Sequence, residues 1–240
     1  MAVPFSEFVI EISLKGQFRG IMDKKGIIFD MDGTIWDSSV NVAASWTYIL
    51  HEYGYKDKTI TCDDFRKVMG KPMDVIADTL FTFTEKGHER DVLRSACEEY
   101  EIKYLRKKGG ILYDRVIETL EELRKMGFHS YIVSNCQSGY IEAFLEHYSI
   151  PYGKAGALIE DIECYGNNLL QKDENIKLLA MRNLLTDACY VGDIQSDYDA
   201  TIRAGYKFIH ARYGFGSIDA DVPYIDDFSH LINVVPKVLG

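Results

Sequence analysis

The sequence has few cysteines, and their arrangement is not typical of a disulfide framework or a zinc site. The odd set is spread along 240 residues without a C-x-x-C pair: Cys62, Cys97, Cys136, Cys164 and Cys189. Disulfide-rich domains carry even sets of cysteines, and zinc clusters carry them at short fixed spacings. We therefore expect reduced, mostly buried cysteines and neither kind of cross-link.

Long apolar runs and basic residues are also scarce. No apolar stretch approaches the roughly 20 residues that a membrane span needs. The apolar N-terminal stretch is interrupted by Glu7 and Glu11 and has no basic lead-in typical of a signal peptide. Lys and Arg number 27 against 37 Asp and Glu, a formal net charge of -10. This charge disfavours nucleic acid and anionic membranes as partners, and we expect a cytoplasmic protein.

What the sequence does contain is an alternation of short apolar runs with longer stretches of helical periodicity. Hydrophobic residues make up 47% and charged residues 27%, as in ordinary globular domains. Strands are predicted at 26–29, 128–133, 188–191 and 207–210, and helices at 114–126, 139–148, 174–185 and 196–204. This alternation predicts an α/β fold, a doubly wound parallel sheet with a Rossmann-like core.

Residues 38–111 break the alternation. Four helical patterns follow one another there without a buried strand, at 40–53, 62–68, 74–80 and 90–106. An all-helical block after the first strand predicts an inserted cap domain, hinged near Ser38 and Ile111. The predicted domains are therefore an N-terminal extension (1–21), an α/β core (22–37 and 112–240) and a helical cap (38–111). Within the extension, the alternation at 10–15 would suit an edge strand.

Two aspartates directly follow the first predicted strand, in the segment Phe29-Asp30-Met31-Asp32-Gly33-Thr34. Ligands bind beyond the carboxyl ends of strands in open α/β sheets, so Asp30 and Asp32 are expected at the functional edge. Two carboxylates so close together need a cation, and hard oxygen ligands favour magnesium or calcium. A calcium-binding loop does not fit, because the glycine falls one position too late and no bidentate acid ends the loop.

Three further polar groups occupy comparable places. Ser134 and Asn135 follow the second predicted strand, where a hydroxyl and backbone N–H groups can hold phosphate oxygens. Lys172 precedes a helical pattern, where it can neutralise a phosphate. Asp193 follows the third strand as a metal ligand, and Asp197 would bind the metal through water or hold Lys172. Each also has an ordinary interpretation as a turn residue, a solvated lysine or an early-helix acid.

The order and spacing of these motifs resemble the haloacid dehalogenase-like superfamily over residues 24–240. The matching segments are FDMDGT at 29–34, the serine after the second strand, the lysine before a helix, and G-D-x-x-x-D at 192–197. The helical block resembles the cap of the phosphoglycolate phosphatase-like group, and residues 211–216 are similar to that group. Trp36 and the absence of a Lys-Pro pair at Lys172 depart from the commonest pattern, so the substrate is less determined than the chemistry.

This resemblance implies a magnesium-dependent phosphatase. Asp30 would attack phosphorus and form an aspartyl-phosphate, and Asp32 would act as general acid and then as general base. Magnesium would be held by Asp30, the backbone carbonyl of Asp32, and Asp193. The other expected site residues are the phosphate ligands Ser134, Asn135 and Lys172 and the supporting residues Thr34 and Asp197.

The implied substrate is a small phosphate ester, either phosphoglycolate-like or a sugar phosphate. Gly70 and Lys71 lie in a turn between two predicted cap helices and would contact the leaving group, although a plain solvated turn is an equally open interpretation. Trp46 and Tyr48 are further candidates for lining that cleft, but aromatic residues at helical spacing more often belong to the core. A phosphomutase carries the same motifs and is an alternative. The resembling mutases have an arginine in the specificity loop where this chain has Met73, which makes this alternative less favoured. A non-catalytic phosphate-binding module is the other alternative. The sequence leaves open a monomer or a homodimer.

Overall fold

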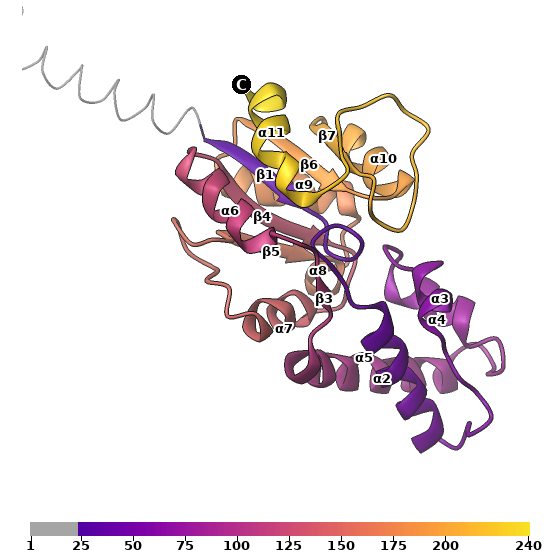
Figure 1. The fold of residues 1–240 in the computed structure, drawn as a ribbon. Helices are drawn as coiled ribbons and strands as arrows, with labels where there is room; N and C mark the ends of the chain where they lie inside the picture. The colour runs from indigo at the N-terminus through magenta and orange to yellow at the C-terminus, as the bar shows by residue number, and fades with distance from the viewer. Residues whose placement is uncertain (1–23) are drawn as a thin grey trace, which may run out of the picture.

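The computed structural model describes residues 24–240 (Figure 1). The predicted N-terminal extension and its edge strand lie outside the described residues. Within residues 24–240, six strands form one sheet in the order β5-β4-β1-β6-β7-β8, and every neighbouring pair is parallel. The predicted doubly wound α/β class is therefore confirmed.

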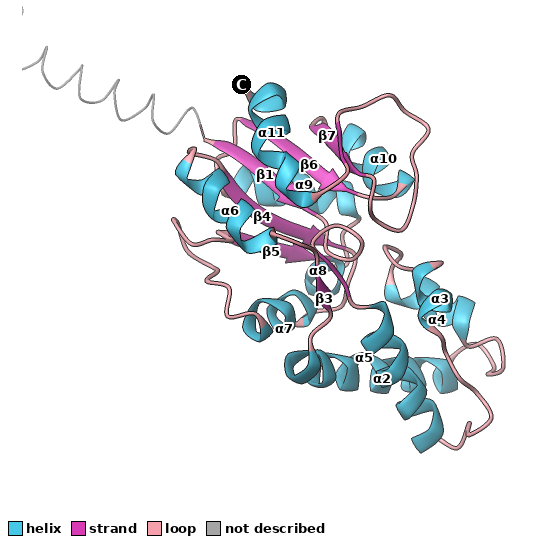
Figure 2. Ribbon diagram, viewed as in Figure 1, coloured by secondary structure: helices cyan, strands magenta, loops and turns pink. Residues whose placement is uncertain are grey.

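The sheet and its helices are the elements of the core (Figure 2). The strands are β1 (Lys25–Phe29), β4 (His129–Ser134), β5 (Asp161–Cys164), β6 (Asp187–Gly192), β7 (Lys207–Ala211) and β8 (Tyr224–Ile225). The helices are α6 (Val116–Lys125), α7 (Tyr140–His147), α8 (Tyr165–Asn168), α9 (Lys172–Arg182), α10 (Gln195–Ala204), the short 3-10 helix η1 (Phe228–His230) and α11 (Leu231–Leu239).

Alternation along β1 creates two packed faces. Ile27 and Phe29 belong to the larger hydrophobic cluster, which includes residues of α6 and α11. Ile28 belongs to a second cluster, which includes residues of α9 and α10. All three side chains are fully buried, as expected for a strand of a parallel sheet that is covered on both faces. This burial holds β1 rigidly, and with it the acidic loop that follows.

Sequence reasoning missed two edge elements, β5 and β8. The β5 sequence, Asp-Ile-Glu-Cys, carries two acids, which hide it from a search for apolar runs. In the fold, Arg182 of α9 forms ion pairs with both acids, Asp161 and Glu163. β8 has only two residues, too few to give a periodic signal.

Four helices occupy the region of the predicted cap, and we call residues 39–108 the helical segment. They are α2 (Ser39–Glu52), α3 (Cys62–Arg66), α4 (Met73–Leu80) and α5 (His88–Lys108). Two short antiparallel strands, β2 (Trp36–Asp37) and β3 (Ile111–Leu112), pair where the chain leaves and re-enters the core. Figure 1 shows the helical segment grouped beside one end of the sheet. This pair of strands lies next to Ser38 and Ile111, the positions near which hinges are predicted.

No helix among residues 24–240 combines the length and the apolar character that crossing a membrane would require.

Candidate active site

Three buried carboxylates meet where β1 and β6 end. The two strands are hydrogen-bonded neighbours, and the backbone N–H of Asp30 donates to the carbonyl of Val191 at 2.9 Å. Oxygen atoms of Asp30, Asp193 and Asp197 lie within 4.8 Å of one another. Each of these residues is at most 2% exposed. The parallel sheet therefore brings together acids that are separated by more than 160 positions in the sequence.

Lys172 is the cation that contacts this cluster. Its Nζ donates to Asp30 Oδ1 at 2.8 Å and to Asp197 Oδ1 at 2.6 Å. Burial acts to lower the pKa of Lys172, but the charges of Asp197 and Asp30 outweigh it and raise the pKa. Lys172 is the first residue of α9, whose N-cap is Gln171, so it lies inside the helix and not before it. One lysine leaves the negative charge of three carboxylates incompletely neutralised.

Asp193 and Asp197 differ in how their oxygens are satisfied. Asp197 Oδ2 accepts hydrogen bonds from the backbone N–H groups of Asp193 at 3.2 Å and Ile194 at 3.3 Å. Asp193 Oδ2 accepts from the N–H of Phe215 at 2.7 Å, whereas its buried Oδ1 has no partner among the described residues. Burial, with the charges of Asp197 and Asp30, raises the pKa of Asp193 well above its usual value.

A buried oxygen without a partner is costly unless a ligand completes it. Carboxylate oxygens are the ligands that hard divalent cations such as Mg²⁺ prefer. Asp193 Oδ1 and the oxygens of Asp30 thus fit a divalent cation at this edge. Asp197, whose oxygens are already engaged, holds Lys172.

Two glycines allow the loops of the cluster to pack closely. A Cβ atom at Gly33 would overlap Asp193 Oδ2, and one at Gly214 would overlap Asp193 Cβ. Gly33 also has a φ of +84°, which a side chain would disfavour. Gly33 in the first motif and Gly214 in the segment 211–216 are thus both required by the close contact with Asp193.

Asp32 lies beside the cluster in a neutral hydrogen-bonding environment. The hydroxyl of Ser38 donates to Asp32 Oδ1 at 2.6 Å, and the hydroxyl of Tyr140 lies 2.8 Å from each Asp32 oxygen. Burial raises the pKa of Asp32 to about 7, although the hydrogen bonds from Ser38 and Tyr140 act to lower it. A carboxyl group with a pKa near neutrality suits proton transfer in both directions.

Sequence reasoning missed both hydrogen-bond partners of Asp32. Ser38 follows the first motif closely in the sequence, so its place there was a usable signal. Tyr140, on α7, carried no such signal, because its contact depends on the packing of that helix.

Ser134 ends β4, next to β1, and lines the same cavity as Asp32. The side chain of Asn135 reaches the helical segment, where its Nδ2 donates to the carbonyl of Gly70 at 2.7 Å. Thr34 is fully buried, its carbonyl accepts from the hydroxyl of Tyr213 at 2.7 Å, and its Oγ1 has no partner within residues 24–240. The structure thus places Ser134 at the cavity and Thr34 behind the acidic loop.

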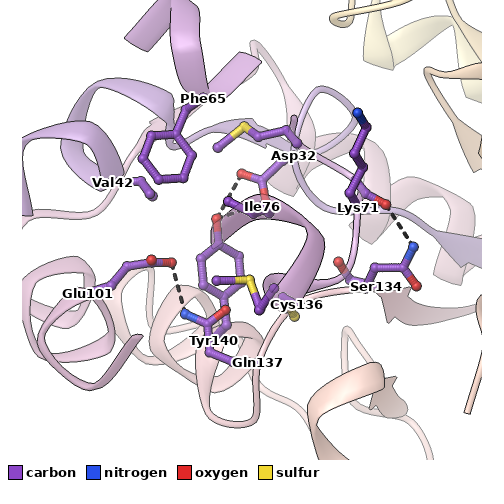
Figure 3. A pocket seen from close by; sticks show the side chains of 14 residues that line it. Asp32, Val42, Phe65, Lys71, Ile76, Glu101, Ser134, Cys136, Gln137 and Tyr140 are labelled. Carbon is purple, nitrogen blue, oxygen red and sulfur yellow. Dashed lines mark hydrogen bonds between the residues drawn. The ribbon is translucent and has the colours of Figure 1, made fainter. Parts of the chain in front are cut away.

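A cavity of about 30 Å³ lies between the core and the helical segment. Gly70 and Lys71 line it together with Asp32, Ser134 and Asn135 (Figure 3). The contact is tight at Gly70, where an added Cβ would overlap Ile194 Cδ1. The turn that contains Gly70 and Lys71 therefore touches the carboxyl edge of the sheet.

The expectation that Trp46 and Tyr48 line this cavity is wrong. Trp46 is fully buried and packs against Phe65 and Phe81 inside the helical segment. Tyr48 is 47% exposed and stacks on Tyr100. Both aromatic side chains stabilise the segment itself, because helical spacing places one on its inner face and the other on its outer face.

An open parallel sheet with an acidic cluster at its carboxyl edge and a helical insertion after the first strand defines a doubly wound α/β enzyme. The chain belongs to the haloacid dehalogenase-like hydrolase family, whose family model matches residues 27–211. It is 28% identical over 229 residues to a phosphoglycolate phosphatase from Vibrio parahaemolyticus, covering 89% of this chain and 96% of that one. It is 25% identical over 248 residues to a phosphoglycolate phosphatase from Shigella dysenteriae, covering 91% and 93%.

The solved structures agree in fold. A haloacid dehalogenase-like hydrolase from Bacteroides fragilis superposes with a TM-score of 0.71 at 22% identity, covering 87% of this chain and 99% of that one. The resemblance that the motifs indicated, including the phosphoglycolate phosphatase-like group, is confirmed. The chain is accordingly a hydrolase of the phosphoric monoester class.

Proposed function

We propose that this protein is a magnesium-dependent phosphatase that hydrolyses a small phosphorylated metabolite through an aspartyl-phosphate on Asp30. The observation that carries the proposal is the buried cluster of Asp30, Asp193 and Asp197. Within residues 24–240 one lysine contacts this cluster, and Asp193 Oδ1 has no hydrogen-bond partner. The phosphoglycolate phosphatases among its relatives support the reaction class. A cytoplasmic location and a monomeric or homodimeric state are part of the same proposal.

Asp30 is oriented for attack by contacts to one of its oxygens. Lys172 Nζ donates to Oδ1 at 2.8 Å, and the hydroxyl of Tyr190, which also contacts the carbonyl of Val133 at 2.7 Å, lies 3.2 Å from the same atom. The other oxygen is the proposed nucleophile. Burial raises the pKa of Asp30 to about 6 even though Lys172 acts to lower it, so one lysine does not fully offset the cost of burying this negative charge, and additional positive charge would stabilise the ionised form. Bound Mg²⁺ would supply that charge and offset the charge that develops on the transferring phosphoryl group.

Asp32 performs the proton transfers. In the first step a bond forms between Asp30 and phosphorus, the ester P–O bond breaks, and Asp32 gives its proton to the leaving oxygen. In the second step Asp32 takes a proton from water, which attacks phosphorus, releases inorganic phosphate and restores Asp30. The hydrogen bonds from Ser38 and Tyr140 hold the Asp32 carboxyl group in place through both steps.

The phosphoryl oxygens would be bound by Ser134, Lys172 and the backbone of the loop at Asn135. The Asn135 side chain already donates to Gly70, so its proposed role joins the phosphate loop to the helical segment. This link makes the segment, with boundaries near 38 and 111, the proposed cap. Gly70 and Lys71 are the proposed contacts to the leaving group, because they bring the cap to the cavity.

The test is a phosphatase assay of the purified chain on para-nitrophenyl phosphate and on a panel of small phosphate esters. Activity should require Mg²⁺ and disappear in excess chelator. Acid-stable trapping of a phosphoprotein from a labelled ester should fail for Asp30→Asn and succeed for Asp199→Asn, an exposed acid two positions from Asp197.

Full turnover in excess chelator would contradict the metal assignment. Retained turnover by Asp30→Asn would place the nucleophile elsewhere. Transfer of phosphate between two positions of a sugar without release of inorganic phosphate would favour a phosphomutase.

A further inference from the structure

Glu101 is a buried acid at the cavity that the proposed mechanism does not use. It lies on α5, is 2% exposed and lines the same cavity as Asp32. Its Oε1 accepts from Gln137 Nε2 at 3.0 Å, and its Oε2 accepts from the indole Nε1 of Trp46. Both donors are neutral, and no lysine, arginine or histidine of residues 24–240 forms an ion pair with Glu101.

Burying an acid beside neutral donors alone lowers the stability of the fold, which is unfavourable for a residue with a purely structural role. Burial raises the pKa of Glu101 to about 8, although the hydrogen bonds from Gln137 and Trp46 act to lower it. A carboxyl oxygen can accept two hydrogen bonds, and each oxygen of Glu101 accepts one from the protein. Acceptor positions are therefore left over on a side chain that faces a cavity, which is a typical feature of a ligand-binding group.

Glu101 lies in the cavity on the side away from Ser134, which is one of the proposed phosphate ligands. Figure 3 shows Glu101 on the side of Tyr140 away from Ser134 and Lys71. Apolar side chains, including Val42, Phe65 and Ile76, form other parts of the cavity wall. A leaving group that starts at Asp32 would pass these apolar side chains to reach Glu101.

Resting on the phosphatase function proposed above, we propose that Glu101 binds a hydroxyl group of the leaving group, so that the preferred substrate is a hydroxylated phosphate ester and not a carboxylated one. Trp46 and Gln137 act as positioning residues that fix the carboxyl group. Of the two substrate classes left open by the sequence, phosphoglycolate-like esters and sugar phosphates, this contact selects the second.

The choice of a hydroxyl group follows from hydrogen-bond chemistry. A hydroxyl both donates and accepts, so it pairs with Glu101 whether the carboxyl group is ionised or protonated. An ammonium group only donates, and burying its charge is offset only when Glu101 is ionised, because the neutral acid offers no opposite charge. A carboxylate would add a negative charge to a buried space that already contains Asp32, Glu101 and the phosphate of the substrate, and it would have to rely on Lys71.

The test compares kcat/KM for matched phosphate esters: ethyl, 2-hydroxyethyl, 2-aminoethyl and carboxymethyl phosphate, together with propyl and 3-hydroxypropyl phosphate. In the wild-type protein, the better of the two hydroxylated esters should exceed its alkyl partner by about tenfold or more, because a site built to bind a hydroxyl rejects the analogue that lacks it. The carboxylated ester should fall below ethyl phosphate.

Two substitutions refine the comparison. Glu101→Leu should bring the ratio of hydroxylated to alkyl ester close to one, whereas Glu101→Gln, which keeps an acceptor, should retain most of it. Glu98→Gln is the matched control, because Glu98 lies on the same helix, pairs with Arg94 at 2.9 Å and does not line this cavity. Each ratio is measured within one protein, so a change in the folded fraction cancels.

Several outcomes would overturn the inference. Equal rates on hydroxylated and alkyl esters, or a preference for the carboxylated ester, would remove Glu101 from substrate recognition even if no Glu101 variant folds. An unchanged ratio in Glu101→Leu would do the same, and the 2-aminoethyl ester as best substrate would replace the hydroxyl by an ammonium group. If para-nitrophenyl phosphate is hydrolysed in these cases, the proposed function survives, whereas no hydrolysis of any ester removes both proposals.

Discussion

The two ends of the central sheet both bury acids but treat them in opposite ways. At the amino end, the carboxylate of Glu160 accepts four hydrogen bonds. They come from Lys24 Nζ at 2.9 Å, His129 Nδ1 at 2.7 Å, the hydroxyl of Tyr131 at 3.1 Å and the N–H of Gly156 at 2.9 Å. At the carboxyl end, the acids that follow β1 and β6 share Lys172. The first acid is fully satisfied by the protein, and the second group is not.

The pKa values follow this difference. Burial acts to raise the pKa of Glu160, but the hydrogen bonds from Lys24 and His129 outweigh it and lower the pKa to about 2. Burial instead dominates at Asp32 and Asp30, whose pKa values rise to about 7 and about 6. A buried carboxylate whose hydrogen bonds and charge are matched by the protein contributes to the stability of the fold. A buried carboxylate that lacks such partners lowers the stability, and a bound ligand can supply the missing partner. The comparison therefore separates a structural acid from the acids that we propose to be functional, and it does so from their surroundings in the fold alone.

The largest expected effect comes from Asp30→Asn. We expect kcat to fall by about 10⁴ or more, because an amide is a poor nucleophile and the steps depend on one attacking group. The melting temperature should stay the same or rise, since the change removes a negative charge from an incompletely neutralised cluster. Steady-state kinetics and a melting curve without Mg²⁺ check the two parts. A large loss of stability would show that Asp30 is a structural acid like Glu160.

Asp193→Asn should act on the cation more than on the fold. Replacing one charged oxygen ligand should weaken Mg²⁺ affinity by about 10². In the absence of metal the free energy of unfolding should be unchanged or higher, because the partnerless Oδ1 no longer carries charge. Calorimetric Mg²⁺ titration and urea unfolding measure these quantities separately. Equal metal affinity in both proteins would exclude Asp193 from the cation site.

Glu160→Gln should show the reverse behaviour. We expect a loss of about 1–3 kcal/mol in the free energy of unfolding, because charge-assisted hydrogen bonds from two partly exposed partners are lost. The kcat and the Mg²⁺ affinity of the folded protein should be unchanged, since Glu160 lies at the opposite end of the strands. Urea unfolding and kinetics on the same preparation provide the test. A fall in kcat without a fall in the free energy of unfolding would contradict the assignment of Glu160 as a structural acid.

The smallest effect is the pH dependence of this same contribution. The folded pKa of Glu160, about 2, lies below the ordinary value of 4.5, so its stabilisation is fully present above about pH 4.5. It should be lost progressively as the pH falls from about 4.5 toward 2. The stability difference between wild type and Glu160→Gln should therefore narrow over that range, as urea unfolding at several pH values can measure. A constant difference would mean that Glu160 is not held ionised by its partners.

Local sequence determined much of the acidic edge that we propose to be catalytic. Asp30, Asp32 and Asp193 were predicted because each follows a short apolar run closely, and the end of a parallel strand fixes where the next residues lie. The four helices of the inserted segment were predicted from the spacing of their apolar residues, which is also a local feature of the sequence. Strand ends and helical periodicity depend on residues that are neighbours in the chain, so the sequence alone is enough to predict them.

Tertiary structure alone decided which groups satisfy which acids. The sequence left open whether Asp197 binds the metal through water or holds Lys172, and the fold decided this by placing Lys172 Nζ between Asp30 and Asp197. Tyr140 and Glu101 gave no local signal at all. The edge strands β5 and β8 escaped detection because their partners, and not their own composition, make them strands. The physical reason is that the energy of a buried charge depends on the atoms that lie near it in space. Those atoms can be far apart along the chain, so the sequence does not show which of them will become neighbours.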